Sequence, residues 1–254
     1  MWKRACALAA LACVALGGPA SASEGGVHPP AQDWEFNGLF GTFDFASAQR
    51  GLQVYEQICH TCHSLDHLAF RHLEQLGFNE DEVAAIAANY QVTDGPDENG
   101  EMFTRPAEPS DFFVPAYANE EAARASNGGA YPPDLSLIVK ARSGGANYIY
   151  AFLTGFDEPP EGEELPSGRY WNEYFPGHQL AMPNMLGTIT AEYTDGTEPT
   201  VHQMAWDVTN FLAWAAEPQM MERKQMGLKV VLFLLVFTAL MYAVKRKIWA
   251  NVHH

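Results

Sequence analysis

Five consecutive residues, Cys59-His60-Thr61-Cys62-His63, constrain this chain more than any other stretch. Residues three apart on a helical turn lie on one face, with Cβ atoms about 5–6 Å apart. Two thiols at this spacing can bond to the two vinyl groups on one edge of a porphyrin, and the histidine that follows can ligate its iron. The motif therefore predicts one covalently bound haem c, attached through Cys59 and Cys62, with His63 as the first axial ligand.

Two other interpretations of a CxxC pair require features that this sequence lacks. A structural zinc site needs further Cys or His ligands at short spacing, and no second CxxC motif occurs. A thioredoxin-like dithiol is typical of a βαβ context and has no directly following histidine. Haem attachment explains all three residues together.

The N-terminus has the pattern of a secretory signal peptide over residues 1–22. It combines a basic start, a short apolar run and the small-residue cleavage site Ala20-Ser21-Ala22. The run is too short to span a membrane, which disfavours an N-terminal membrane helix. Cleavage after Ala22 removes Cys6 and Cys13, so only the two motif cysteines remain.

A second apolar run covers residues 226–244 near the C-terminus. At 1.5 Å per residue it reaches about 28 Å, close to the thickness of a bilayer core. We therefore predict a transmembrane anchor helix over 222–247. Lys245-Arg246-Lys247 favours a cytoplasmic tail at 248–254. The signal peptide places the rest of the chain on the periplasmic side of the inner membrane, in a single-pass topology.

The predicted haem domain, residues 23–221, is strongly acidic. It holds 7 Lys and Arg against 30 Asp and Glu, a formal charge of −23. Such a charge repels nucleic acid and anionic lipid and speeds encounters with a basic protein. Two acidic loops, 94–101 and 157–164, are candidates for steering a basic acceptor. That they are merely solvated loops is the alternative, and composition does not separate the two.

The fold class predicted from the patterns is mainly α: a cytochrome c-like haem domain of short helices and long ordered loops, plus one C-terminal transmembrane helix. Ser47 predicts the cap of a helix that continues into the haem motif. Residues 190–198 predict a small strand pair around the turn Asp195-Gly196. Capping pairs predict two further helix starts: Asn79 with Glu82, and Thr200 with Gln203.

A methionine as sixth ligand would raise the reduction potential and close the iron to other chemistry. Met204 lies on the apolar face of a predicted helix, so we expect it to pack in the core. Met182 precedes Pro183, which stiffens a loop and suits a thioether held at a fixed point. Met185 is its close rival, and residue patterns leave both open.

Several ordered sequence blocks occur along nearly the whole mature chain. They include CHTCHS at 59–64, PPDLS at 132–136, YFPG at 174–177, Ala181-Met182-Pro183 and WAAEP at 214–218. Together these blocks resemble the cytochrome c1 family, the membrane-anchored haem subunits of cytochrome bc1 complexes.

The resemblance implies that Met182 is the sixth ligand, that Arg142 and Tyr148 hold the haem propionates, and that Asn127 and Pro133 line the pocket. A propionate in a poorly hydrated crevice needs a charge-assisted partner, which suits an arginine. The family tends to have two adjacent prolines just beyond the ligand methionine. Here the run is Met182-Pro183-Asn184-Met185, so Met185 stays a candidate.

The resemblance also implies a function: an electron carrier within a quinol–cytochrome c oxidoreductase, with no catalytic residue of its own. The expected donor is the Rieske iron–sulfur protein and the expected acceptor is cytochrome c, in a respiratory or photosynthetic chain. Cytochrome b and membrane lipid are the expected neighbours, in a dimeric complex. The alternatives are an independent membrane-tethered c-type cytochrome, and a haem enzyme or sensor with an open iron site.

Overall fold

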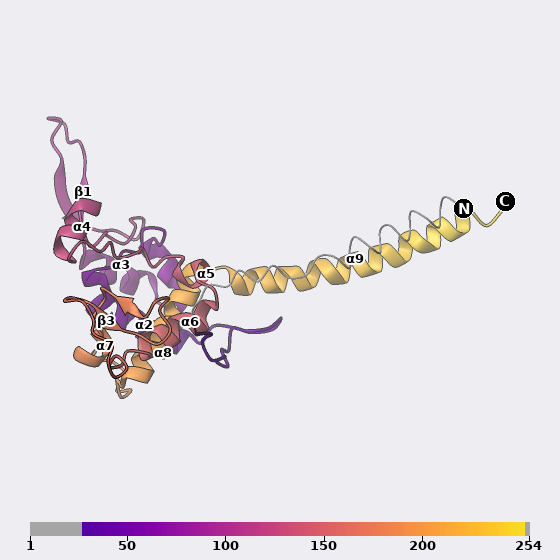
Figure 1. Cartoon of the computed structure of the whole chain (residues 1–254). Coiled ribbons are helices and arrows are strands. Elements are labelled where there is room, and N and C mark those ends of the chain that lie inside the picture. Colours follow the sequence, from indigo (N-terminus) through magenta and orange to yellow (C-terminus); the bar gives the residue numbers. More distant parts are fainter. Residues whose placement is uncertain (1–26, 252–254) are drawn as a thin grey trace, which may run out of the picture.

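The computed structural model describes residues 27–251. Figure 1 shows a helical body from which one long helix, α9 (Met220–Ile248), projects. The fold is helix-rich with few short strands, as the sequence patterns predict. The expected signal peptide 1–22 lies outside the described residues, as do the last three residues of the expected tail.

Two crossing helices, α2 (Phe45–Gln57) and α8 (Val201–Ala216), form the centre of the body. They approach closely at Gly51, where an added Cβ would lie 2.1 Å from the carbonyl oxygen of Asp207. Only glycine permits this approach. Met204 is buried in α8, which confirms it as a packing residue.

A buried polar cluster joins the same two helices. Asp207 is fully buried and accepts hydrogen bonds from Ser47 Oγ at 2.7 Å and from Arg50 Nε at 2.9 Å. Gln203 Nε2 donates to it from one turn away in α8. Asn210 Nδ2 donates to Ser47 Oγ at 3.0 Å. Because every member has partners, the cluster fixes the register of α2 against α8.

The ends of α2 differ from the prediction. Its N-cap is Asp44, whose side chain accepts from the backbone N–H of Ser47, and Ser47 points inward to the cluster instead of capping. The helix also stops at Gln57, because Ile58 leaves helical geometry. The haem motif therefore does not continue α2. It begins a separate 3₁₀ turn, η1 (Cys59–Thr61).

Both helix starts predicted from capping pairs are present. Asn79 and Glu82 form the expected reciprocal cap of α3 (Glu80–Ala88), and Thr200 caps α8 by accepting from Gln203 N. The others are η2 (Phe70–Leu76), α4 (Glu120–Ser126), α5 (Ile138–Ala141), α6 (Gly145–Thr154) and α7 (Met185–Thr188).

The strand pair expected at 190–198 is wrong, since this segment is irregular. Its backbone N–H groups bond to side chains instead of to a second strand. Glu192 N donates to Gln57 Oε1 at 2.8 Å, and Thr194 N donates to Gln53 Oε1 at 3.0 Å. The side chains of Gln53 and Gln57 thus accept from backbone N–H groups that would otherwise donate to a neighbouring strand.

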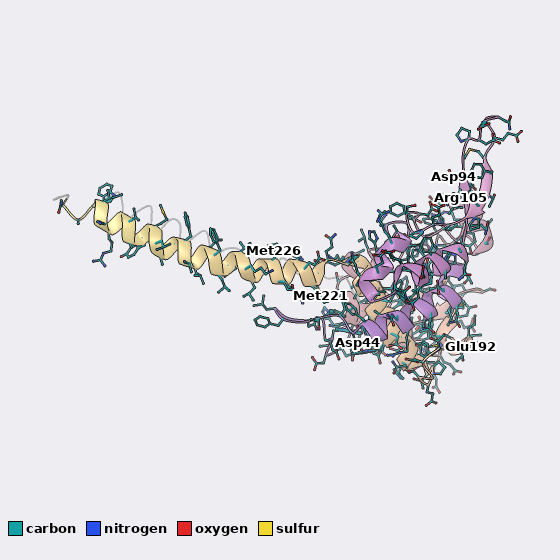
Figure 2. The ribbon with its side chains drawn as sticks, turned by 180° about the vertical axis from the view of Figure 1, so that it is seen from behind. Asp44, Asp94, Arg105, Glu192, Met221 and Met226 are labelled. Carbon is teal, nitrogen blue, oxygen red and sulfur yellow. The ribbon has the colours of Figure 1, made fainter. Side chains whose placement is uncertain are left out.

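Four other segments form two antiparallel strand pairs that the sequence patterns did not indicate. β1 (Gln91–Asp94) pairs with β2 (Phe103–Pro106), and β3 (Tyr170–Trp171) pairs with β4 (Gln179–Leu180). Figures 1 and 2 show the β1–β2 hairpin standing out from the body, away from α9. Arg105 at its base pairs with Asp94 and Asp111. The acidic turn predicted at 94–101 forms the tip.

Helix α9 is the one helix of the described residues that is long and apolar enough to cross a membrane. It begins two residues before the expected anchor at 222–247 and ends one residue after it. Its most apolar 18 residues have a mean hydropathy of 2.3 and none is buried against the body. Three basic residues, 245–247, occupy its last turn.

Candidate haem-binding site

The imidazole of His63 is held by one backbone carbonyl. Its Nδ1 lies 2.7 Å from the carbonyl oxygen of Pro133, so Nδ1 carries the proton and donates it. Nε2 is then an acceptor, and the described residues give it no hydrogen-bond partner. Burial lowers the pKa of His63. A neutral ring with a free Nε2 is the form that ligates a metal.

A set of hydrogen bonds fixes Pro133 against the haem motif. Leu135 N donates to the carbonyl oxygen of Ser64 at 2.9 Å. Asp134 accepts from Asp66 N at 2.7 Å through one carboxylate oxygen and from Ser136 N at 2.8 Å through the other. The PPDLS block is thus tied to the residues that follow the motif, which explains how a carbonyl 70 positions away reaches His63.

The two motif cysteines are half-buried and unpaired. Burial raises the pKa of Cys59 to about 12, so its thiol stays protonated. Redox dithiols of the CxxC type need a depressed thiol pKa, and this environment opposes that chemistry. Within residues 27–251, no group of three or more Cys, His, Asp or Glu side chains is arranged to hold a metal ion.

Asn127 reaches the motif through a tyrosine. Its Nδ2 donates to Tyr117 Oη at 3.1 Å, and that hydroxyl lies 3.8 Å from the sulfur of Cys62. The same Nδ2 also donates to the carbonyl oxygen of Ala123, which fixes the amide at the end of α4. Asn127 therefore lies on the Cys62 side of the site.

A buried tyrosine supports the motif from the core side. Tyr55 is fully buried in α2, and its hydroxyl donates to the carbonyl oxygen of His63 at 3.1 Å. The same hydroxyl lies 3.2 Å from His60 Nδ1 and can accept a hydrogen bond from it when that nitrogen is protonated. Burial raises the pKa of Tyr55 far above its usual range. The hydroxyl is therefore a permanent donor to the motif backbone.

Arg142 and Tyr148 lie on consecutive elements. Arg142 ends α5 and is exposed, and its guanidinium donates only to the adjacent carbonyl of Ala141, at 3.4 Å. None of the ion pairs in residues 27–251 includes it. Tyr148 is half-buried in α6 and stacks on Phe152 at 6.0 Å. An arginine without a carboxylate partner is available to an anionic ligand group.

Met182 lies in the bend after β4, in a segment that is tied to α6. Asn172, fully buried, donates through Nδ2 to the carbonyl oxygen of Phe152 at 2.7 Å. Glu173 N donates to the carbonyl oxygen of Gly155 at 2.9 Å. These bonds connect the end of α6, the helix that carries Tyr148, with the two residues that follow β3. β3 pairs with β4, and the half-buried Met182 follows β4.

Met185 has a different environment. It is the first residue of α7, and its side chain packs against the hydrophobic core. Asn184 caps this helix by accepting from Gly187 N at 2.9 Å. A methionine held at a helix start by core contacts has less freedom to reach a ligand than one in a bend, which favours Met182 over Met185.

An open depression of about 370 Å³ lies beside β3 and contains none of the predicted haem residues. The acidic loop 157–164 contributes Asp157 and Glu158 to its lining, and Asn184 lines it from the other side. The depression thus places part of this acidic loop next to the segment between Met182 and α7.

Sequence patterns missed three residues that build the site: Tyr117, Tyr55 as a donor to the motif backbone, and Asn172. Each acts across a long sequence separation or through a turn. The hydrogen bond from Tyr55 to the carbonyl oxygen of His63 has no sequence signal. Asn172 alone among them is a fully buried amide, a feature that sequence does not reveal.

The residues present fit a haem. The chain supplies two thiols, a neutral imidazole with a free nitrogen, an unpaired arginine and a half-buried thioether. With one candidate membrane-spanning helix among residues 27–251, close to the C-terminus, fold and site define the class of anchored c-type cytochromes.

Comparison with known proteins identifies the family. The model of the "Cytochrome C1 family" matches residues 34–252. A "Cytochrome c1" of Rhodospirillum rubrum is 47% identical over 268 residues, covering 99% of this chain and 98% of that protein. This chain belongs to the cytochrome c1 family.

Two further relatives carry names that mention an assembly. A "Cytochrome b-c1 complex catalytic subunit, mitochondrial" of Candida albicans is 48% identical, covering 91% of this chain and 81% of that protein. A "Cytochrome b/c1" of Bradyrhizobium diazoefficiens is 45% identical over 98% of this chain, which spans 41% of that protein.

Proposed function

We propose that this chain is the haem-bearing electron-transfer subunit of a cytochrome bc1 complex. It takes one electron from the Rieske iron–sulfur protein and passes it to cytochrome c. The observation that carries the proposal is the motif geometry: two unpaired thiols and an imidazole whose Nδ1 is bound to Pro133, which leaves Nε2 free.

Each site residue has a proposed task. Cys59 and Cys62 attach the haem, and His63 and Met182 ligate its iron. Arg142 and Tyr148 hold the propionates, while Asn127 and Pro133 line the pocket. A haem bound there supplies a one-electron iron couple. The chain contributes orientation of the His63 ring through Pro133, and exclusion of water by the core packing around Tyr55.

The names of relatives support the partners. The Candida protein is named as a bc1 complex subunit, and the Bradyrhizobium protein joins both names, cytochrome b and c1, in one chain. We infer from them that cytochrome b is the membrane neighbour of α9. That the complex is dimeric is a further proposal, which these names do not address. The haem domain is proposed to lie on the periplasmic side of the inner membrane, with the basic end of α9 in the cytoplasm.

The junction between body and anchor supports a fixed subunit over an independent tethered shuttle. Only residues 217–219 separate α8 from α9. Glu217 in this junction pairs with Lys140 at 2.9 Å and also with Arg223. A mobile shuttle requires a long flexible tether, and this junction is short and held by contacts on both sides.

The deciding experiment compares Met182→Leu with its matched control, Met185→Leu, in the membrane-bound holoprotein. Loss of a thioether ligand should lower the reduction potential by on the order of 0.1 V or more, within the range of about 0.8 V that axial ligands control. The reduced Met182 variant should also bind carbon monoxide. An unchanged spectrum in Met182→Leu, or the expected changes in Met185→Leu, would contradict the assignment. Ready carbon monoxide binding by the unaltered protein would favour an enzyme or sensor instead.

A further inference from the structure

A short loop next to the root of α9 exposes two large apolar side chains. The loop, residues 35–42, is closed by a hydrogen bond from Thr42 N to the carbonyl oxygen of Glu35 at 3.1 Å. Leu39 and Phe40 at its tip are 62% and 76% exposed, and Phe40 is the most exposed large apolar side chain among the described residues. We call residues 37–40 the apolar tip.

The shape of this loop is fixed from inside. Trp34 and Phe43, which flank it, are buried, and Trp34 stacks on Trp206 of α8 at 4.1 Å. An added Cβ at Gly41 would lie 2.0 Å from the carbonyl oxygen of Asn37, so the close turn requires glycine there. The apolar tip is therefore held outward by a rigid base, although outward apolar residues lower solubility.

A lysine of α9 fastens the loop to the anchor. Lys224 Nζ donates to the carbonyl oxygen of Phe36 at 2.7 Å and to that of Gly41 at 3.0 Å. These carbonyls lie on the two sides of the apolar tip. In both views an indigo segment from the N-terminal part of the described chain extends from the body in the direction of α9, and Figure 2 labels Met226 further out on the same helix.

The position along α9 sets the depth of the tip. Lys224 is two residues, about 3 Å of helix rise, before Met226, where the exposed apolar surface of α9 begins. The interfacial layer on each side of a bilayer is about 5–7 Å thick. Leu39 and Phe40 are within two residues of Gly41, one of the two residues whose carbonyls Lys224 binds. The base of the loop is therefore held at the level of α9 just before its exposed apolar surface begins.

We propose that the apolar tip inserts into the outer interface of the bilayer, as a second membrane contact beside α9. The occupant is lipid, because the tip carries no charge of its own and its base is bonded to the anchor two residues before the exposed apolar surface of α9 begins. Segments that place Leu and Phe into the headgroup–acyl boundary bind in this way. With α9 alone the body could tilt about the junction, whereas a second contact restricts the orientation of the haem domain above the membrane. This inference rests on the proposed spanning role of α9.

The test uses the full-length holoprotein in phosphatidylcholine vesicles, where a fraction of the lipid carries a photoreactive diazirine in the upper part of one acyl chain. After illumination, crosslinked peptides are mapped by mass spectrometry. We expect crosslinks on Leu39 and Phe40 and on α9. Met102 and Phe103 of the hairpin provide the matched control, since they are 61% and 44% exposed but lie away from α9; they should remain unlabelled.

Two variants sharpen the result. Leu39→Ser with Phe40→Ser should reduce crosslinking of the loop, and Lys224→Met should reduce it as well by releasing the loop from α9, while α9 itself stays crosslinked in both. Crosslinks on α9 without any on the loop would overturn the proposal, and would leave the tip to a partner protein such as cytochrome b. Absence of crosslinks on α9 would instead contradict the proposed anchor, so the two failures are distinguishable.

Discussion

The Nδ1 atom of His63 lies 2.7 Å from the carbonyl oxygen of Pro133, and this one contact sets which nitrogen of the ring faces outward. Pro133 is positioned in turn by the next residue, Asp134. Its carboxylate accepts a hydrogen bond from the backbone N–H of Asp66, just after the haem motif, and another from that of Ser136, in its own segment. The first prediction tests this dependence.

Asp134→Ala should destabilise the protein by about 1–3 kcal/mol, because two backbone donors lose a charged acceptor. The loosened carbonyl should also alter the environment of the His63 ring, which a shift in reduction potential would report. Thermal unfolding and potentiometry measure the two effects. Asp97→Ala is the control, because Asp97 also accepts two backbone N–H groups but lies in the exposed hairpin tip. Equal effects of the two variants would show that Asp134 has no special role.

Asp207→Ala should be strongly destabilising, by about 3–5 kcal/mol, because it leaves the guanidinium of Arg50 in a largely buried place without its main partner. Burial is the reason for the size of the effect: Asp207 is fully buried, whereas Asp195, the second partner of Arg50, is exposed. Asp195→Ala should therefore leave the unfolding temperature nearly unchanged. A comparison of both variants by thermal unfolding checks the prediction, and similar losses would refute it.

Glu56→Gln should stabilise the protein at neutral pH. Burial raises the pKa of Glu56 above its usual value of 4.5, so the folded state favours the protonated form and ionisation at higher pH costs stability. The advantage of the variant should be present at pH 7, and should disappear as the pH falls below 4.5. Unfolding temperatures at both ends of this range measure it.

Tyr90→Phe should change the stability at neutral pH in the opposite direction. Tyr90 Oη donates to Glu56 Oε1 at 3.2 Å and so supports the ionised carboxyl. Its removal should destabilise the protein at neutral pH more than in acid. A pH-independent difference in either variant would mean that Glu56 does not titrate in this range.

Electron transfer to a basic cytochrome c should slow as ionic strength rises, because the body is acidic and salt screens long-range attraction. Of the two acidic loops, 157–164 borders the depression next to Asn184, close in sequence to Met182, whereas 94–101 lies at the end of the projecting hairpin. Neutralising the carboxylates of 157–164 should therefore flatten the salt dependence more than neutralising those of 94–101. A rate that does not change with salt would exclude steering by either loop.

Local patterns predicted much of this protein. The caps at Asn79 and Thr200 and the core position of Met204 were predicted from spacing alone and are confirmed, because each depends on residues a few positions apart. The predicted cap of α2, its predicted continuation into the haem motif and the strand pair at 190–198 were wrong. The cap and the strand pair were decided by side-chain partners outside the local pattern. Asp44 took the cap while Ser47 turned to Asp207, and glutamines of α2 took the N–H groups of residues 192 and 194.

The sequence by itself was enough to predict the attachment chemistry and the anchor, since a thiol spacing of three and an apolar run of bilayer length are properties of neighbouring residues. Only the tertiary structure decided that Pro133 orients His63 and that Lys224 holds an apolar loop against the root of α9. These contacts involve backbone carbonyls, which every residue carries. Which carbonyl a side chain contacts therefore follows from the packing of the chain and cannot be predicted from residue type alone.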